Sequence, residues 1–144
     1  MSYLIDTCSI SELAKSDPNR NVKQWFSHHN EIDLYLSVIT FGEIRKGIEK
    51  LPSSKRKRRL NHWLNEDLLH RFKNRVLDIT MREANQWGKT LTKAEKNGTP
   101  LPAVDALIAA TGLAHDFAVV TRNTNDMEAS GVELINPWKY EANT

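Results

Sequence analysis

Cysteine is almost absent from this chain. Cys8 is the single cysteine in 144 residues, so an intrachain disulfide is impossible. That count fits a reducing compartment and argues against a thiolate zinc site. The first residues lack a basic segment followed by an apolar one, so we expect no signal peptide. No apolar run reaches the roughly 18 residues that a membrane span needs, and we expect a cytoplasmic protein with no membrane partner.

Glycine-rich phosphate loops are absent as well. Neither the G-x-G-x-x-G dinucleotide fingerprint nor the P-loop pattern occurs, which excludes the commonest cofactor enzymes built on a parallel sheet. The 5 histidines show no zinc-ligand spacing such as His-x-x-x-His. The content is otherwise ordinary for a globular protein, with 40% hydrophobic and 26% charged residues. The length suits one domain, which we expect to span residues 1–144.

Short apolar segments alternate with helical patterns along the chain. Strands are predicted at 3–6, 33–39, 76–79, 117–121 and 132–135. Helices are predicted at about 9–16, 19–29, 40–51, 54–72, 80–96 and 103–115. This alternation predicts an α/β fold with a mostly parallel sheet of about five strands and helices on both faces. Ligands bind beyond the carboxyl ends of strands in such sheets, so acids directly after strands are candidate functional residues.

Four acids meet that condition: Asp6, Glu43, Asp105 at the start of the helix after Pro102, and Asp126 in the loop after strand 117–121. Hard divalent cations such as Mg²⁺ and Mn²⁺ prefer oxygen ligands, and clustered carboxylates repel one another unless a metal neutralises them. A metal held there can activate a water and stabilise charge on a phosphodiester. The pattern therefore indicates a metal-dependent phosphodiesterase site.

Each of these acids also has an ordinary structural alternative. Asp6 suits a helix N-cap, and Glu43 would complete a capping box with Thr40. Asp105 would offset the helix macrodipole, and Asp126 would serve as a loop or cap residue. Taken singly, each acid fits the structural role better than the catalytic one.

The pattern Ser/Thr-x-x-Glu occurs three times where a helix is expected to begin. It is found at Ser9–Glu12, at Thr40–Glu43 and at Thr80–Glu83. Each copy predicts a capping box. The second and third copies both follow a short apolar strand, so spacing alone does not choose between Glu43 and Glu83 as a site residue.

The central third of the chain is strongly basic. Between Arg45 and Arg75, eleven Lys or Arg stand against three acids, a balance of +8 in a chain of net charge +2. The candidate nucleic-acid contacts are Arg45, Lys46, Lys55, Arg56, Lys57, Arg58 and Arg59, with Arg122 next to the predicted acidic site. Such a patch gives salt-sensitive, sequence-independent affinity for phosphates. A solvated helix face is the alternative for a run of charge.

Several segments together resemble the ordered motifs of PIN-domain proteins, in particular the VapC/FitB-like toxins of toxin–antitoxin pairs. They are Leu4-Ile5-Asp6-Thr7, Ser37-Val38-Ile39-Thr40-Phe41-Gly42-Glu43-Ile44, Asp105-Ala106-Leu107-Ile108-Ala109-Ala110-Thr111 and Val119-Val120-Thr121-Arg122-Asn123. The ending Asn136-Pro137-Trp138 is also similar to that branch. The motifs occur in the family's order over essentially the whole chain.

The resemblance implies a Mg²⁺- or Mn²⁺-dependent endoribonuclease toxin that cleaves single-stranded or structured RNA. It assigns Asp6, Glu43 and Asp105 as catalytic metal ligands. Many relatives carry Asp where this chain has Asn123, so the fourth position is open; we expect Asp126 there, with Asn123 as an indirect ligand. Cys8 stands where Asn or Ser is common, and we expect a plain buried residue rather than a polar neighbour of the site.

The resemblance also implies partners. They are an RNA substrate, a homodimer mate and a cognate antitoxin that docks across the basic helices and over the acidic site. A non-catalytic PIN-like scaffold that binds nucleic acid or a partner protein is the alternative function.

Overall fold

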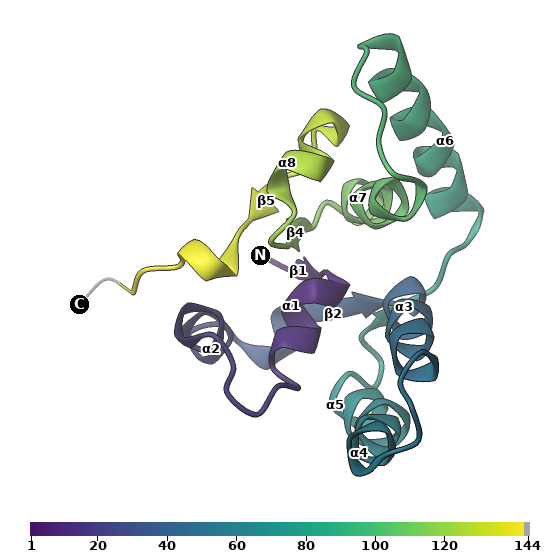
Figure 1. Cartoon of the computed structure of the whole chain (residues 1–144). Helices are drawn as coiled ribbons and strands as arrows, with labels where there is room; N and C mark the ends of the chain where they lie inside the picture. Colours follow the sequence, from purple (N-terminus) through teal and green to yellow (C-terminus); the bar gives the residue numbers. More distant parts are fainter. Residues whose placement is uncertain (143–144) are drawn as a thin grey trace.

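A parallel five-stranded sheet forms the centre of the protein in a computed structural model that describes residues 1–142 (Figure 1). Its strands are β1 (Tyr3–Ile5), β2 (Leu34–Ser37), β3 (Val76–Leu77), β4 (Ala118–Val120) and β5 (Leu134–Ile135). Their order across the sheet is β3-β2-β1-β4-β5, and each neighbouring pair is parallel. The predicted α/β fold is confirmed. Because β1 lies between β2 and β4, the residue that follows it sits at the middle of the sheet's carboxyl edge.

The helices connect these strands. They are α1 (Thr7–Glu12), α2 (Arg20–Ser27), α3 (Val38–Glu49), α4 (Lys55–His62), α5 (Leu69–Arg71), α6 (Met81–Lys96), α7 (Ala103–His115) and α8 (Thr124–Met127). Single turns of 3₁₀-helix form η1 (Glu31–Asp33), η3 (Glu128–Ser130) and η4 (Pro137–Lys139), and η2 (Trp63–Leu68) is π-helical. Among residues 1–142, no helix is both long enough and apolar enough to cross a membrane.

The two faces of the sheet are covered by separate apolar clusters. Ile5 packs in the cluster that holds Trp25 of α2, whereas Leu4 packs in the cluster that holds Ile108 of α7. Successive residues of a strand point to opposite faces, so a continuous apolar run is buried on both sides. Figure 1 shows α6, α7 and α8 grouped on one side of the sheet and α1, α2, α4 and α5 on the other. The predicted helices on both faces are therefore present.

Two of the three predicted capping boxes are wrong. Helix α1 begins at Thr7 with Asp6 as its cap, and α3 begins at Val38 with Ser37 as its cap. In both places the strand passes directly into the helix, so the cap is the last strand residue or its neighbour rather than the Ser or Thr three residues on. Only the Thr80–Glu83 pair makes a capping box.

The predicted basic helix over 54–72 forms as α4, η2 and α5 in succession. A π-helical turn holds more residues than an α-helical one and changes which side chains face inward. Leu64, Leu68 and Phe72 are buried after this change. Leu60 precedes η2 and Trp63 is its first residue, and both side chains are only partly buried.

Gly112 allows α7 to lie close against β4, and α7 carries Asp105. A Cβ atom at position 112 would lie 2.8 Å from Val119 Cγ2 and 3.0 Å from the Phe117 carbonyl oxygen. We expect Gly112→Ala to lower the free energy of unfolding by roughly 1–3 kcal/mol through overpacking. Chemical denaturation measures this.

Gly88 of α6 is the matched control, because a Cβ there meets no atom within 4 Å. Gly88→Ala should raise the free energy of unfolding by up to about 1 kcal/mol through helix propensity. Equal effects of the two substitutions would contradict the close approach of α7 to β4.

Candidate active site

Asp6 follows β1 at the centre of the sheet's carboxyl edge and is 4% exposed. Its Oδ1 accepts a hydrogen bond from the Thr7 backbone N–H at 2.8 Å, and its Oδ2 accepts one from the Thr121 hydroxyl at 2.7 Å. The Cys8 thiol also donates to Oδ2 at 3.5 Å. Asp6 is thus both a helix cap, as its structural alternative predicted, and a carboxylate held by the first residue of α1 and by the residue that follows β4.

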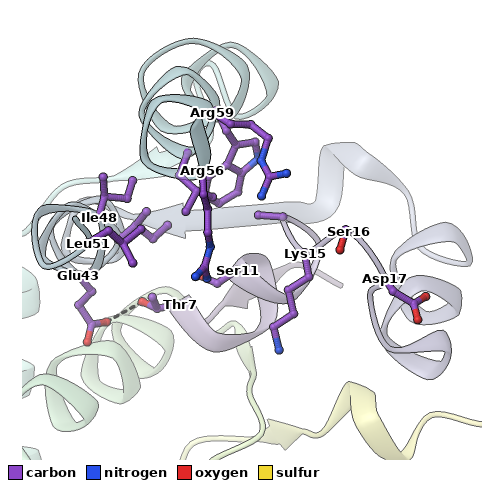
Figure 2. Close-up of a pocket in the computed structure, with 15 residues that line it drawn as sticks. Thr7, Ser11, Lys15, Ser16, Asp17, Glu43, Ile48, Leu51, Arg56 and Arg59 are labelled. Carbon is purple, nitrogen blue, oxygen red and sulfur yellow. Dashed lines mark hydrogen bonds between the residues drawn. The ribbon is translucent and has the colours of Figure 1, made fainter. Parts of the chain in front are cut away.

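Glu43 is half-buried on the second turn of α3. Its Oε1 accepts a 2.6 Å hydrogen bond from the Thr7 hydroxyl, drawn as a dashed line in Figure 2. Thr7 therefore joins two of the predicted site acids, through its backbone N–H to Asp6 and through its hydroxyl to Glu43. The predicted capping role of Glu43 with Thr40 is excluded, because Thr40 already lies inside α3.

Glu83 has the structural role that Glu43 lacks. It is 2% exposed, accepts hydrogen bonds from the backbone N–H and the hydroxyl of Thr80, and contacts His115 Nε2 at 2.9 Å. Burial raises the pKa of Glu83, but the hydrogen bonds from Thr80 and His115 outweigh it and lower the pKa to about 2. Glu83 thus closes α6 onto α7 and stands apart from the other acids.

Asp105 lies in the first turn of α7, and Asp126 lies in the first turn of α8 rather than in a loop. The pKa of Asp105 is raised by burial first and then by the negative charges of Asp6, Asp126 and Glu43. The other three predicted carboxylates therefore lie close enough to Asp105 to act on it electrostatically. Glu83 is not among the causes of the shift.

Asn123 and Cys8 border the same acids. Asn123 takes the N-cap position of α8, and its backbone N–H donates to the Thr121 hydroxyl at 3.0 Å. The thiol of Cys8 contacts both Asp6 Oδ2 and the Arg122 backbone N–H at 3.5 Å, so the expectation of a plain buried residue is wrong. Burial first, and then the Asp6 charge, raise the pKa of the thiol.

The donor chemistry of these acids fits a hydrated hard cation. Within residues 1–142, no three His, Cys, Asp or Glu side chains are grouped closely enough to hold a metal between them. Mg²⁺ commonly keeps several waters and takes only one or two carboxylates directly. Carboxylates that raise the pKa of a common neighbour supply the charge for such an ion. The Cys8 thiol is the one soft donor beside these acids within residues 1–142, which is too few for a zinc site.

A groove of about 700 Å³ opens beside Glu43 between α1, α3 and α4 (Figure 2). Its apolar lining includes Ile44, Ile48, Leu51, Leu60 and Trp63, and its cations are Lys15, Arg56 and Arg59. The groove was not predicted from the sequence. Its signal was present in Leu60 and Trp63, which lie on the basic helix at a spacing of three residues.

The predicted basic residues between positions 45 and 59 fall into three groups. Arg56 and Arg59 line the groove. Arg45 and Lys57 are engaged elsewhere, Arg45 with Asn65 and Glu49, and Lys57 with the Leu51 carbonyl oxygen. Lys46, Lys55 and Arg58 are exposed on the helix surfaces. The structure thus divides what the sequence presented as one patch.

The model of the PIN domain family matches residues 3–129 of this chain. The chain belongs to the PIN domain family. Among PIN relatives, it is 40% identical to the plasmid stability protein StbB of Pseudomonas syringae pv. tomato, over 94% of this chain and 98% of the relative. It is 36% identical to the VapC ribonuclease Y4jK of Sinorhizobium fredii, over 94% and 97%. It is 35% identical to the toxin FitB of Neisseria gonorrhoeae, over 94% and 97%.

Solved structures of similar sequence share the fold of this chain. The crystal structure of FitAcB from Neisseria gonorrhoeae superposes with a TM-score of 0.90 at 34% identity, covering 95% of this chain and 99% of the other. The structure of FitAB bound to an IR36 DNA fragment gives a TM-score of 0.91 at 33% identity, covering 99% of both chains. The PIN resemblance predicted from the sequence is confirmed.

Proposed function

We propose that this PIN-domain protein is a metal-dependent endoribonuclease and the toxin of a toxin–antitoxin pair. The relatives named VapC ribonuclease and toxin FitB support the activity class. The observation that carries the proposal is the joining of Asp6 and Glu43 through Thr7. Asp105 belongs to the same group, because its pKa is raised by burial first and then by the charges of Asp6, Asp126 and Glu43. RNA as substrate places the activity in the cytoplasm, and we take residues 1–144 to act as one domain.

The catalytic residues that we propose are Asp6, Glu43, Asp105 and Asp126. Bound Mg²⁺ or Mn²⁺ would lower the pKa of a water and neutralise charge on the phosphodiester. Asp6 and Glu43 are oriented for this by Thr7 and, at Asp6, by Thr121. Asp105 and Asp126 lie in the first turns of α7 and α8.

Asn123 would act indirectly, since its exposed amide carries no charge. Its position at the start of α8 sets it beside Asp126, three residues further along the chain. The carbonyl oxygen of the amide can accept a hydrogen bond from a metal-bound water. We therefore propose Asp126 as the fourth acid.

Metal binding should raise the melting temperature, and the rise should shrink as the pH is lowered. The raised pKa of Asp105 means that its charge destabilises the metal-free fold at neutral pH. An ion that binds only the folded state removes this penalty and adds its own binding energy. Lower pH protonates Asp105 before an ordinary aspartate, so the ion then loses a ligand charge.

Thermal melting with Mg²⁺ or Mn²⁺ at a series of pH values measures this effect. The baseline is the same protein in EDTA, which removes divalent metal. Asp78→Asn is a control, because Asp78 is not among the groups that shift the pKa of Asp105. Absence of any shift with either ion would favour the non-catalytic scaffold over the nuclease.

We propose that the groove beside Glu43 receives the cognate antitoxin. An apolar lining that also carries the three cations Lys15, Arg56 and Arg59 fits the apolar face of an amphipathic helix that also carries acids. Exposed apolar side chains in the first turns of three helices, Val38, Met81 and Val104, support the further proposal of a homodimer.

Arg59→Glu should weaken antitoxin binding by roughly tenfold or more, because the new carboxylate would repel the acids on the antitoxin helix. Arg58→Glu is the matched control, because Arg58 neighbours Arg59 but does not line the groove. Isothermal titration of each variant with the purified antitoxin measures the difference. Equal losses would indicate general charge attraction instead of this groove.

A further inference from the structure

Arg122 extends from the acidic site toward the C-terminal turn. It directly follows Thr121, whose hydroxyl holds Asp6, and its backbone N–H donates to the Cys8 thiol at 3.5 Å. Its guanidinium carbon lies 5.1 Å from the centre of the Trp138 ring. The backbone of Arg122 therefore belongs to the candidate active site, whereas its side chain lies on an aromatic surface.

Trp138 is itself fixed in place. Its carbonyl oxygen accepts a 2.7 Å hydrogen bond from the Asn21 side-chain amide of α2. Its backbone N–H donates to Asn136 Oδ1 at 3.0 Å, which caps η4, and Pro137 in the same turn is buried. These contacts fix the backbone of Trp138, and its side chain packs against the core cluster that holds Trp25. The ring therefore offers a fixed face to the guanidinium, because a cation is attracted to the ring face.

The guanidinium of Arg122 is free to bind an anion. The side chain is exposed, and no ion pair between residues 1 and 142 includes it. Glu12 is the acid that it influences. The pKa of Glu12 is lowered mainly by its hydrogen bond with Lys15, and the Arg122 charge contributes less than Lys15 or the Asn19 backbone N–H. The Glu12 carboxylate is thus already satisfied by other donors.

We propose that Arg122, oriented by Trp138, is a subsite for a backbone phosphate of the RNA next to the phosphate that is cleaved. This inference rests on the ribonuclease function proposed above. Four carboxylates repel a polyanion, so a cation fixed at their border would offset that repulsion. The planar guanidinium donates two parallel hydrogen bonds to phosphate oxygens while its face stays on the ring. Arg122 is the binding residue, and Trp138 is a positioning residue.

The test compares Arg122→Gln, Trp138→Leu and Trp138→Phe with wild type on a single-stranded RNA oligonucleotide. Arg122→Gln should raise KM by roughly tenfold with a smaller change in kcat, as expected for a lost charged hydrogen bond. It should also reduce the slope of log affinity against log salt by about one. Trp138→Leu should raise KM in the same direction, and Trp138→Phe should restore most of it.

Lys139→Gln is the matched control, because it removes an exposed cation from the same turn without contact to Arg122. It should leave KM and the salt slope unchanged. The double variant Arg122→Gln/Trp138→Leu should bind no more weakly than Arg122→Gln alone, since the ring acts only through the guanidinium. A merely structural role of Trp138 would instead lower the melting temperature and add to the effect of Arg122→Gln.

An unchanged KM and salt slope in Arg122→Gln, with wild-type protein cleaving RNA, would overturn the subsite and leave the ribonuclease function standing. Absence of metal-dependent cleavage by wild type would overturn the ribonuclease function instead. In that event, RNA binding measured in EDTA by fluorescence anisotropy still decides the subsite. Equal affinity and equal salt slope for wild type and Arg122→Gln would reject it.

Discussion

Asp105→Asn should reduce metal-dependent RNA cleavage by roughly 10³-fold or more, which is about 4 kcal/mol of transition-state stabilisation. Asparagine has nearly the same shape as aspartate but carries no charge, so the proposed metal loses a ligand and its neutralising partner. Toxicity to the host cell should be lost together with cleavage. Cleavage rates of the two purified proteins on the same RNA measure the effect.

The same substitution should not harm the fold. Asp105 carries a pKa raised by burial and by three neighbouring carboxylates, so its charge opposes folding when no metal is present. Asp105→Asn should therefore melt at the same temperature as metal-free wild type or higher, and addition of Mn²⁺ should move its melting temperature less. Full cleavage by a well-folded Asp105→Asn protein would reject the assigned site.

Glu43→Gln and Glu83→Gln should have opposite consequences. Glu43→Gln should reduce the cleavage rate by roughly 10³-fold, as Asp105→Asn does. It should lose little stability, because the glutamine side chain still accepts the Thr7 hydrogen bond. Glu83→Gln should cost about 2 kcal/mol of stability, because a buried carboxylate that is bonded to Thr80 and His115 is lost. The specific activity of folded Glu83→Gln protein should match wild type.

The pH dependence of stability gives a further test of the structural role of Glu83. The pKa of Glu83 falls from 4.5 to about 2 in the folded state. A lowered pKa contributes stability above the unfolded value, and this contribution is lost as the pH falls through the folded value. Glu83→Gln should therefore flatten the acid limb of the stability curve relative to wild type. Denaturation at several acidic pH values measures the difference.

The sheet and most helices could be predicted from the sequence because their signals are local. The continuous apolar run at 117–121 and the alternation of strands with helices are sufficient for a parallel sheet. The helix over 103–115 was predicted with the limits that it has in the structure. Helix starts at Thr7 and Val38 were missed, since nothing local reveals that a strand passes into a helix without a loop.

The choice between Glu43 and Glu83 shows where local signals end. Both acids follow a short strand in the same Thr-x-x-Glu pattern. What separates them is the partner that each meets across the fold, Thr7 for Glu43 and His115 for Glu83. The groove likewise forms only where α1, α3 and α4 meet in the fold. The Arg122–Trp138 contact joins residues sixteen positions apart in the chain. Such partners are fixed by the topology of the sheet.

The metal dependence of the four-carboxylate site can be measured as cleavage of a defined single-stranded RNA by the purified protein, first with EDTA and then with excess Mn²⁺. We expect no cleavage in EDTA, cleavage once Mn²⁺ is in excess, and no such recovery in Asp105→Asn. Cleavage that continues in EDTA, or that recovers equally in Asp105→Asn, would contradict a metal-dependent nuclease centred on these carboxylates.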